Sequence, residues 1–165
     1  MKKRYGRIAA GLTVLLGMTH PAFAGTATTT FPVTATVLSV CSVSASPLNF
    51  GNYDPTATSD LDATTSLDVL CTLGTSYTVG LDQGTSSGAT VSARAMVNGS
   101  DTLNYGLYQD AGRSTNLGNT AGVDTPSATV AGLTATSHTV YGRVPQGQNV
   151  APGVYLDTIT VTVNY

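Results

Sequence analysis

The sequence predicts an all-β protein built as a sandwich of two sheets. From residue 25 onward it is dominated by Thr, Ser, Gly, Ala and Val. Short runs that alternate apolar with polar residues are separated by Gly, Asn, Asp and Pro, which is the pattern of strands and tight turns. No segment in that part has a convincing helical period of apolar residues. We therefore expect strands joined by loops.

The first 24 residues have the features of a secretory signal peptide. Basic residues open the chain, an apolar run from Ile8 to Met18 follows, and Ala22-Phe23-Ala24 precedes Gly25. The apolar run is too short to span a bilayer and ends at a small-residue cleavage site. We expect cleavage after Ala24 and export of the protein. The remaining 141 residues are the size of one domain.

Positive charge is scarce after the signal peptide. That part of the chain has three Arg (Arg94, Arg113 and Arg143) against nine Asp, with neither Lys nor Glu, so its formal charge is −6. Nucleic acids and anionic membrane surfaces are held mainly by clustered Lys and Arg. The composition therefore argues against nucleic acid and membrane partners and favours a protein partner.

The two cysteines, Cys41 and Cys71, are predicted to form a disulfide because export takes them into an oxidising compartment. A catalytic or metal-binding thiol pair is disfavoured, since there is no CxxC spacing and no His nearby. Closing a loop of this length would stabilise the fold by about 3–4 kcal/mol on the chain-entropy model. No metal and no cofactor are expected.

Alternation marks the central strands. Each of the first two has one predicted buried face, formed by Leu67, Val69 and Cys71 and by Tyr77, Val79 and Leu81. A hairpin is predicted next, in which Val91, Ala93, Ala95 and Val97 alternate up to a turn at Asn98-Gly99, and Leu103, Tyr105 and Leu107 resume the alternation.

A long polar loop is predicted from Asp110 to Ser127, because that stretch has no apolar period. A strand over His138 to Val144 follows, and the last strand begins at Gly153. The last strand is the most regular, with Ile159, Val161, Val163 and Tyr165 on one face. It runs to the terminal residue, so nothing follows it to pair with its second edge, and we expect another strand to cover that edge.

Residues 25–40 form a Thr-rich arm with a strand pattern but without a local partner. Its apolar residues Phe31, Val33, Ala35 and Val37 alternate with Pro32, Thr34 and Thr36. No hairpin turn joins it to the domain over residues 41–165. Pro32 removes one ladder hydrogen bond and suits an end or edge position.

Five groups of residues resemble the spore coat protein U family, which includes the pilins of archaic chaperone-usher pili. They are Cys41-Ser42-Val43, Leu48-Asn49-Phe50-Gly51-Asn52-Tyr53-Asp54, Leu103-Asn104-Tyr105-Gly106-Leu107-Tyr108, Tyr141-Gly142-Arg143-Val144-Pro145 and Gly153-Val154-Tyr155-Leu156-Asp157-Thr158.

The resemblance implies an incomplete immunoglobulin-like sandwich that lacks one strand. In the family a periplasmic chaperone fills the gap first, and the N-terminal arm of the next subunit replaces it at an outer-membrane usher, which builds a fibre outside the cell. Carried onto this chain, the donor residues are Phe31, Val33, Ala35 and Val37, and the acceptor edge is Ile159, Val161, Val163 and Tyr165. The implied function is a homopolymeric surface pilus that supports adhesion and biofilm formation, assembled by donor-strand exchange.

An enzyme is disfavoured because general acid-base chemistry would rest on one histidine, His138, in a predicted strand. Asp60 and Asp62 fit a turn better than a calcium site. The tyrosines fit packing better than a carbohydrate platform. Two other functions stay open: a surface-binding adhesin at a pilus tip, and a secreted, spore-coat-like structural protein that forms no fibre. The single domain with an arm favours a fibre subunit over a tip adhesin.

Overall fold

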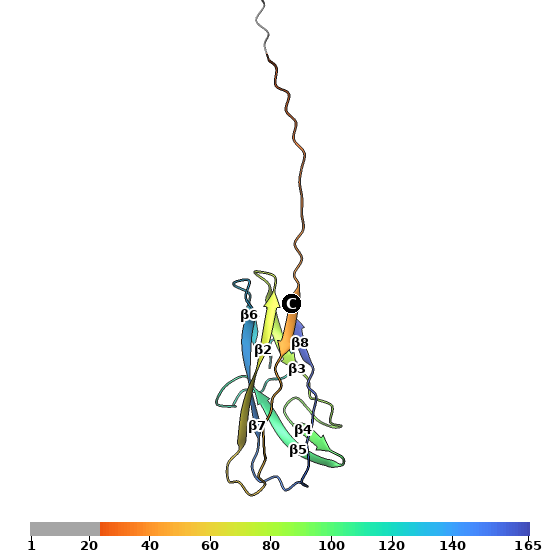
Figure 1. The fold of residues 1–165 in the computed structure, drawn as a ribbon, viewed down its shortest axis with the longest axis vertical. Helices are drawn as coiled ribbons and strands as arrows, with labels where there is room; N and C mark the ends of the chain where they lie inside the picture. Colours follow the sequence, from red (N-terminus) through yellow and green to blue (C-terminus); the bar gives the residue numbers. More distant parts are fainter. Residues whose placement is uncertain (1–23) are drawn as a thin grey trace, which may run out of the picture. The chain divides into compact units, whose positions relative to one another are not determined.

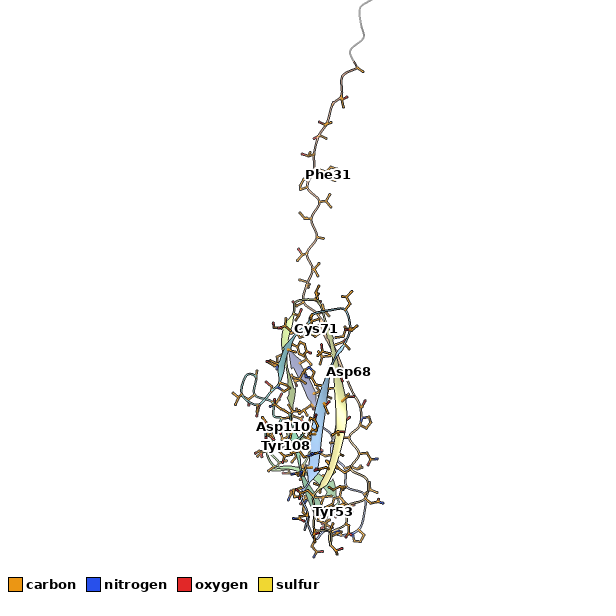
Figure 2. The ribbon with its side chains drawn as sticks, turned by 90° about the vertical axis from the view of Figure 1, so that its left-hand side faces the viewer. Phe31, Tyr53, Asp68, Cys71, Tyr108 and Asp110 are labelled. Carbon is orange, nitrogen blue, oxygen red and sulfur yellow. A yellow bond between two sulfur atoms is a disulfide. The ribbon has the colours of Figure 1, made fainter. Side chains whose placement is uncertain are left out.

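The computed structural model describes residues 24–165, so the predicted signal peptide lies outside the described residues apart from Ala24. These residues belong to two units, residues 24–35 and residues 36–165. The first unit has no strand or helix, and its apolar side chains are exposed, Phe31 by 79% and Val33 by 84%. Figure 2 shows Phe31 on this extended segment.

Residues 36–165 form two antiparallel sheets (Figure 1). The five-stranded sheet has the order β1-β2-β7-β5-β4, and the three-stranded sheet has the order β6-β3-β8. The strands are β1 (Cys41–Ala45), β2 (Leu61–Cys71), β3 (Ser76–Leu81), β4 (Arg94–Asn98), β5 (Asp101–Tyr108), β6 (Ser127–Thr129), β7 (Thr136–Val144) and β8 (Val161–Asn164). The all-β prediction is confirmed for the described residues. No helix among them has the length and apolarity needed to cross a membrane.

The predicted disulfide is confirmed. Cys41 and Cys71 are opposite each other in the β1–β2 register and are joined by a disulfide, with their Cα atoms 4.0 Å apart. The bond fixes one end of the sandwich, where β1 begins and β2 ends. In Figure 2 Cys71 lies towards this end, and Tyr53 lies near the opposite end.

The core lies between the two sheets, where the alternating residues of the central strands meet. The predicted inward faces of β2, β3 and β5 are confirmed by burial. The buried residues on these strands are Leu67, Val69, Cys71, Tyr77, Val79, Leu81, Leu103, Tyr105 and Leu107. Val140 and Val144 of β7 complete this layer, which agrees with the strand predicted there.

The predicted hairpin is present, but its first strand is turned over. Arg94 pairs with Tyr105 and Met96 pairs with Leu103, so Arg94 and Met96 face the core. The predicted alternation of Val91, Ala93, Ala95 and Val97 thus does not mark the core face of β4, although Ala95 is also buried, at 7% exposure. The turn is also displaced by one residue, because Asn98 pairs with Asp101 and the connecting residues are Gly99 and Ser100. Gly99 has φ +61°, which suits a two-residue turn with Gly first.

The stretch from Asp110 to Ser127 is a loop, as predicted, but it is not confined to the surface. Leu117 is buried at 2% exposure, and its N–H donates to the Leu107 carbonyl over 2.9 Å. Ser127 begins β6, a strand that was not predicted because three residues are too few to show an alternation.

The final strand is shorter than predicted, since β8 begins at Val161 rather than at Gly153. Before β8 the chain crosses from one sheet to the other: Val161 pairs with Leu81 of β3, whereas Leu156 forms an isolated bridge with Val97 of β4. Side chains replace the ladder at the crossing. The Asp82 carboxylate accepts a hydrogen bond from the Thr160 N–H over 2.9 Å. Such local side-chain bonds compete with regular strand pairing.

Candidate strand-binding groove

Each sheet has two edge strands, β1 and β4 in the larger sheet and β6 and β8 in the smaller one, and the pair of interest here is β1 and β8. Each is hydrogen-bonded on one side only, β1 to β2 and β8 to β3, and within residues 24–165 no strand pairs with the other side. The two strands lie near each other, but no hydrogen-bonded ladder connects them. Outward-facing N–H and C=O groups on a free edge are a template for another strand.

A groove of about 400 Å³ opens between the sheets on this side of the sandwich. One wall is the segment after β1, the other is the segment that leads into β8, and buried core residues form the floor. The wall residues include Ala45, Leu48, Phe50, Tyr155, Asp157, Ile159 and Val161, and the floor residues include Leu67, Leu81, Tyr105, Leu107 and Val140.

A second hollow, of about 890 Å³, continues the groove towards the Tyr53 end of the sandwich. The two hollows share several lining residues, among them Leu48, Phe50, Met96 and Tyr155. The walls here are the irregular segments 47–55 and 150–156, which the alternation could not predict as part of a site. Together the two hollows form one elongated opening along the side of the sandwich.

The residues beside the groove face inward yet are incompletely covered. Val43 is opposite Val69 in the β1–β2 register, so both point to the same side of the sheet. Val69 is fully buried, whereas Val43 is 39% exposed. On the opposite wall Ile159, Val161 and Val163 are only half-buried, although they pack against the core. The sandwich therefore leaves inward-facing apolar surface uncovered along both walls.

Of the predicted acceptor residues, Val161 and Val163 lie in β8 and Ile159 lies just before it. Tyr165 lies beyond the end of β8 and is 60% exposed. Of the predicted donor residues, Val37 belongs to the sandwich unit, where it is 82% exposed and outside any strand. Phe31, Val33 and Ala35 belong to the segment over residues 24–35.

Among the described residues that line the groove, Asp157 is the one with a charged side chain. Its Oδ2 accepts a hydrogen bond from the Tyr105 hydroxyl over 2.7 Å. Its Oδ1 accepts two from Thr85, from the N–H over 2.8 Å and from the hydroxyl over 2.9 Å. Burial, followed by the hydrogen bond to Asp157, raises the pKa of the Tyr105 phenol well above its usual value, so Tyr105 remains a donor.

A buried arginine holds the floor of the groove together. Arg94 is fully buried, and its guanidinium donates to four backbone carbonyls, those of Leu81, Asp82, Val91 and Leu117, over 2.6–3.0 Å. Burial lowers the pKa of Arg94, although an arginine stays protonated in proteins. The alternation does not single out Arg94, because a cation in an alternating strand is normally assigned to the solvent face.

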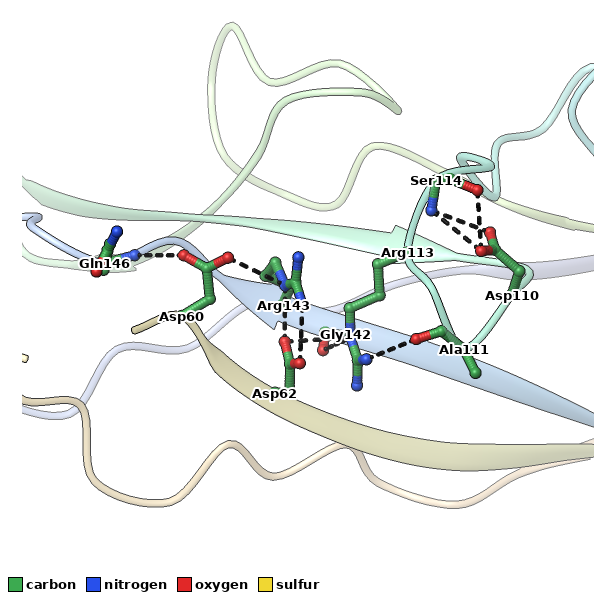
Figure 3. Close-up of polar contacts among 9 residues, drawn as sticks. All are labelled: Asp60, Asp62, Asp110, Ala111, Arg113, Ser114, Gly142, Arg143 and Gln146. Atoms are coloured by element: carbon green, nitrogen blue, oxygen red, sulfur yellow. Dashed lines mark hydrogen bonds and ion pairs between the residues drawn. The ribbon is translucent and has the colours of Figure 1, made fainter. Parts of the chain in front are cut away.

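Two arginines and two aspartates form an ion-pair network (Figure 3). Arg143 donates to both oxygens of Asp62 over 2.8 and 2.9 Å, and it lies 3.3 Å from Asp60. Arg113 contacts Asp62 over 3.1 Å. The turn predicted for Asp62 is wrong, because Asp62 lies in β2 directly opposite Arg143 of β7. Hydrogen bonding to Arg143 holds the pKa of Asp62 below its usual value.

His138 also has a structural partner. Its Nε2 lies 2.9 Å from the Tyr77 hydroxyl, and the two rings meet edge to face. Burial lowers the pKa of the imidazole. Among the described residues no group of three or more His, Cys, Asp or Glu side chains has a geometry that would hold a metal ion.

The geometry defines a class of protein: an antiparallel β-sandwich with one disulfide and an open groove between its sheets. The Spore Coat Protein U domain model matches residues 27–162, and the chain belongs to this family. The predicted resemblance is thus confirmed.

Two relatives are similar to the chain. Protein U of Myxococcus xanthus is 41% identical over 160 residues, which covers 88% of both chains. The other is a chain in the crystal structure of the CsuC–CsuE chaperone–tip adhesion subunit pre-assembly complex from the archaic chaperone-usher Csu pili of Acinetobacter baumannii. It is 25% identical, with a TM-score of 0.57 over 79% of this chain. Our chain spans about two fifths of that chain's length, since it covers 40% of it.

Proposed function

We propose that this protein is a structural subunit of a bacterial surface pilus, assembled by the chaperone-usher pathway through donor-strand exchange. The observation that carries the proposal is the groove between β1 and the segment leading into β8, which leaves inward-facing apolar side chains such as Val43 and Ile159 half-covered. Similarity to a chain from a chaperone–subunit complex of Csu pili supports it.

The N-terminal arm of a second copy is the occupant that fits this groove. Its apolar residues Phe31, Val33, Ala35 and Val37 have the two-residue period of a strand and are exposed in the chain's own structure. Alternate side chains would fill the groove, and the arm backbone would pair with the free edge of β8. Burying an aliphatic or aromatic side chain contributes about 1.5–3 kcal/mol. Burial of three such residues therefore contributes a binding free energy similar in size to the stability of a whole domain, which is about 5–15 kcal/mol.

A subunit whose groove is empty exposes apolar surface and an unpaired strand edge, both of which promote aggregation. A periplasmic chaperone that covers the groove before assembly is therefore a required partner in this proposal, and an outer-membrane usher is the site of exchange. The product is a homopolymer on the cell surface, outside the outer membrane. We propose that this fibre supports adhesion and biofilm formation.

A secreted coat protein is a second candidate, favoured by the family's description as a Spore Coat Protein U domain and by the similarity to Protein U. It has the same fold, and the same groove would need a partner. Electron microscopy of cells with and without the gene separates the two functions, since a pilus subunit gives fibres and a coat protein gives a surface layer.

The proposal is tested by placing a charge on the apolar row of the arm. Val33→Asp or Val37→Asp would bury a carboxylate in the neighbour's groove, so we expect fibres to disappear while the chaperone complex forms normally. Thr34→Asp is the matched control, because Thr34 lies on the opposite row and its charge would face outward. Normal fibres from the Val33→Asp and Val37→Asp variants would refute donor-strand exchange through this arm.

A further inference from the structure

The groove contains a feature that can fix the register of an incoming strand, namely the Asp157 carboxylate. Half-buried and exposed residues alternate along the segment that forms this wall: Tyr155, Asp157, Ile159 and Val161 are half-buried and line the groove, whereas the residues between them are exposed. Three of these four are apolar. Asp157 is therefore the one position in this row where the residue opposite must sit beside a charged group.

The carboxylate is held in place and has little freedom to turn away. Tyr105 binds Oδ2 from the floor over 2.7 Å, and Thr85 binds Oδ1 twice over 2.8 and 2.9 Å. Gly84, the residue before Thr85, has φ +84°, and an added Cβ there would clash with the Asp157 carboxylate. A bulky apolar side chain laid over the carboxylate from the groove would strip it of water.

We infer that Ala35 of the incoming arm lies opposite Asp157, and that this pair sets the register of donor-strand exchange. The inference rests on the proposed function and extends it. Of the four apolar arm residues, Ala35 is the smallest, and its single methyl group covers the carboxylate least. Phe31, Val33 or Val37 at the same place would bury the charge under a large apolar group.

The orientation follows from the sheet. Every strand pair in the sandwich is antiparallel, and antiparallel pairs are slightly more stable per residue than parallel ones. An arm that pairs antiparallel to the β8 segment with Ala35 at Asp157 places Val33 at Ile159, Phe31 at Val161 and Val37 at Tyr155.

This arrangement also accounts for uncovered surface at both ends of the groove. Phe31 reaches the part of the groove beside β1 and β8, where Val43 is 39% exposed although it faces inward. Val37 reaches the wider hollow lined by Leu48, Phe50 and Tyr155. A register shifted by two residues in either direction puts a Val over Asp157 and leaves Ala35 opposite a position that has room for a larger side chain.

Cysteine cross-linking of assembled fibres tests the register. The full chain carrying Val33→Cys and Ile159→Cys should give a ladder of covalent multimers after mild oxidation. The shifted pairs Phe31→Cys with Ile159→Cys and Val33→Cys with Val161→Cys should give on the order of tenfold less, because a two-residue shift places the Cα atoms about 7–8 Å apart. A ladder from Val37→Cys with Ile159→Cys would instead indicate a parallel arm.

The outcomes separate the inference from the proposed function. A ladder strongest in a shifted or parallel pair overturns the register and leaves donor-strand exchange in place. Fibres that give no ladder with any pair also overturn it. A disulfide-linked monomer from Val33→Cys with Ile159→Cys would show the arm in its own groove, and both the inference and the proposed function would then be lost.

A size test at Ala35 gives an independent result. Ala35→Leu should reduce fibre yield on the order of tenfold, which corresponds to about 1.4 kcal/mol of lost binding, while complex formation with the chaperone stays unchanged. Val33→Leu is a control for a larger side chain on the same row away from Asp157, and it adds one carbon atom where Ala35→Leu adds three. Ala35→Ser should assemble because its hydroxyl can donate to Asp157. Wild-type fibre yield from Ala35→Leu would overturn the inference.

Discussion

The Tyr105 hydroxyl donates a 2.7 Å hydrogen bond to Asp157, and this bond ties the five-stranded sheet to the segment that leads into β8. It lies on the floor of the groove, between two walls that have no backbone ladder between them. The wall on the β8 side is thus positioned by a side-chain bond to the core.

We expect Tyr105→Phe to lower the free energy of unfolding by about 1.5–3 kcal/mol, the range for a hydrogen bond to a charged group. Urea unfolding of the purified protein measures the loss. Tyr155→Phe is the matched control, because the Tyr155 hydroxyl bonds the Ala151 carbonyl at an exposed site and should be worth less. Equal effects of the two substitutions would count against a special role for the Tyr105–Asp157 bond.

We expect substitution of Arg94 to lower the free energy of unfolding more than substitution of any other single residue in the sandwich. Arg94→Met keeps an apolar stem but leaves buried carbonyls of β3 and of the loop at Leu117 without a donor, so we expect a loss of about 3 kcal/mol or more. Arg94→Lys should rescue little, since one ammonium group cannot span four carbonyls as the planar guanidinium does. Thermal unfolding and soluble yield measure both variants. A stable Arg94→Met protein would contradict the role assigned to this residue.

We expect the folded protein to lose stability in acid, because protonation of Asp62 would break its ion pair with Arg143. The pKa of Asp62 is lowered in the folded protein, so the stabilisation is present above the unfolded pKa of about 3.9 and is lost as the pH falls through the folded value. Unfolding midpoints measured between pH 6 and pH 2 should therefore fall below about pH 4. Asp62→Asn should flatten this part of the curve. The pair is partly exposed, so the effect should shrink in high salt.

We expect the disulfide to contribute most to the stability of the subunit before it is assembled. Cys41→Ser removes the cross-link between β1 and β2 and should lower the free energy of unfolding by about 3–4 kcal/mol on the chain-entropy model. We expect lower periplasmic levels of the subunit, as measured by quantitative immunoblotting. Unchanged abundance of this variant, together with a wild-type protein in which mass spectrometry finds no disulfide, would argue against the bond.

The fold could be predicted from the sequence where one face of a strand is buried and the other is exposed to solvent. Leu67, Val69 and Cys71 show this alternation, and so do Tyr77, Val79 and Leu81, because each row meets the opposite sheet. Alternation did not identify the core face of β4, because Arg94 lies on that face. Arg94 donates hydrogen bonds to backbone carbonyls there instead of packing against apolar neighbours.

The groove was only partly predictable. Val161 and Val163 were assigned to its edge from their regular alternation, but Leu48 and Phe50 line it from a segment with no strand period. Asp157 could not be found from periodicity, since its place on the inward row depends on long-range partners, Tyr105 and Thr85. Sites built from irregular segments need the tertiary structure to be seen.

The central claim is that the sandwich is one strand short and that the arm of another molecule supplies it. The most direct measurement uses the purified chain with Val33→Asp and Val37→Asp, which disables its own arm, and a synthetic peptide of residues 27–40. The account predicts binding of one peptide per chain and, at a hundredfold excess over Kd, a rise in the unfolding midpoint of roughly 5–15 °C. The same peptide with Val33→Asp should have no effect. An unchanged unfolding midpoint with the unaltered peptide would contradict the account. So would a wild-type protein that is a stable monomer and does not bind the peptide.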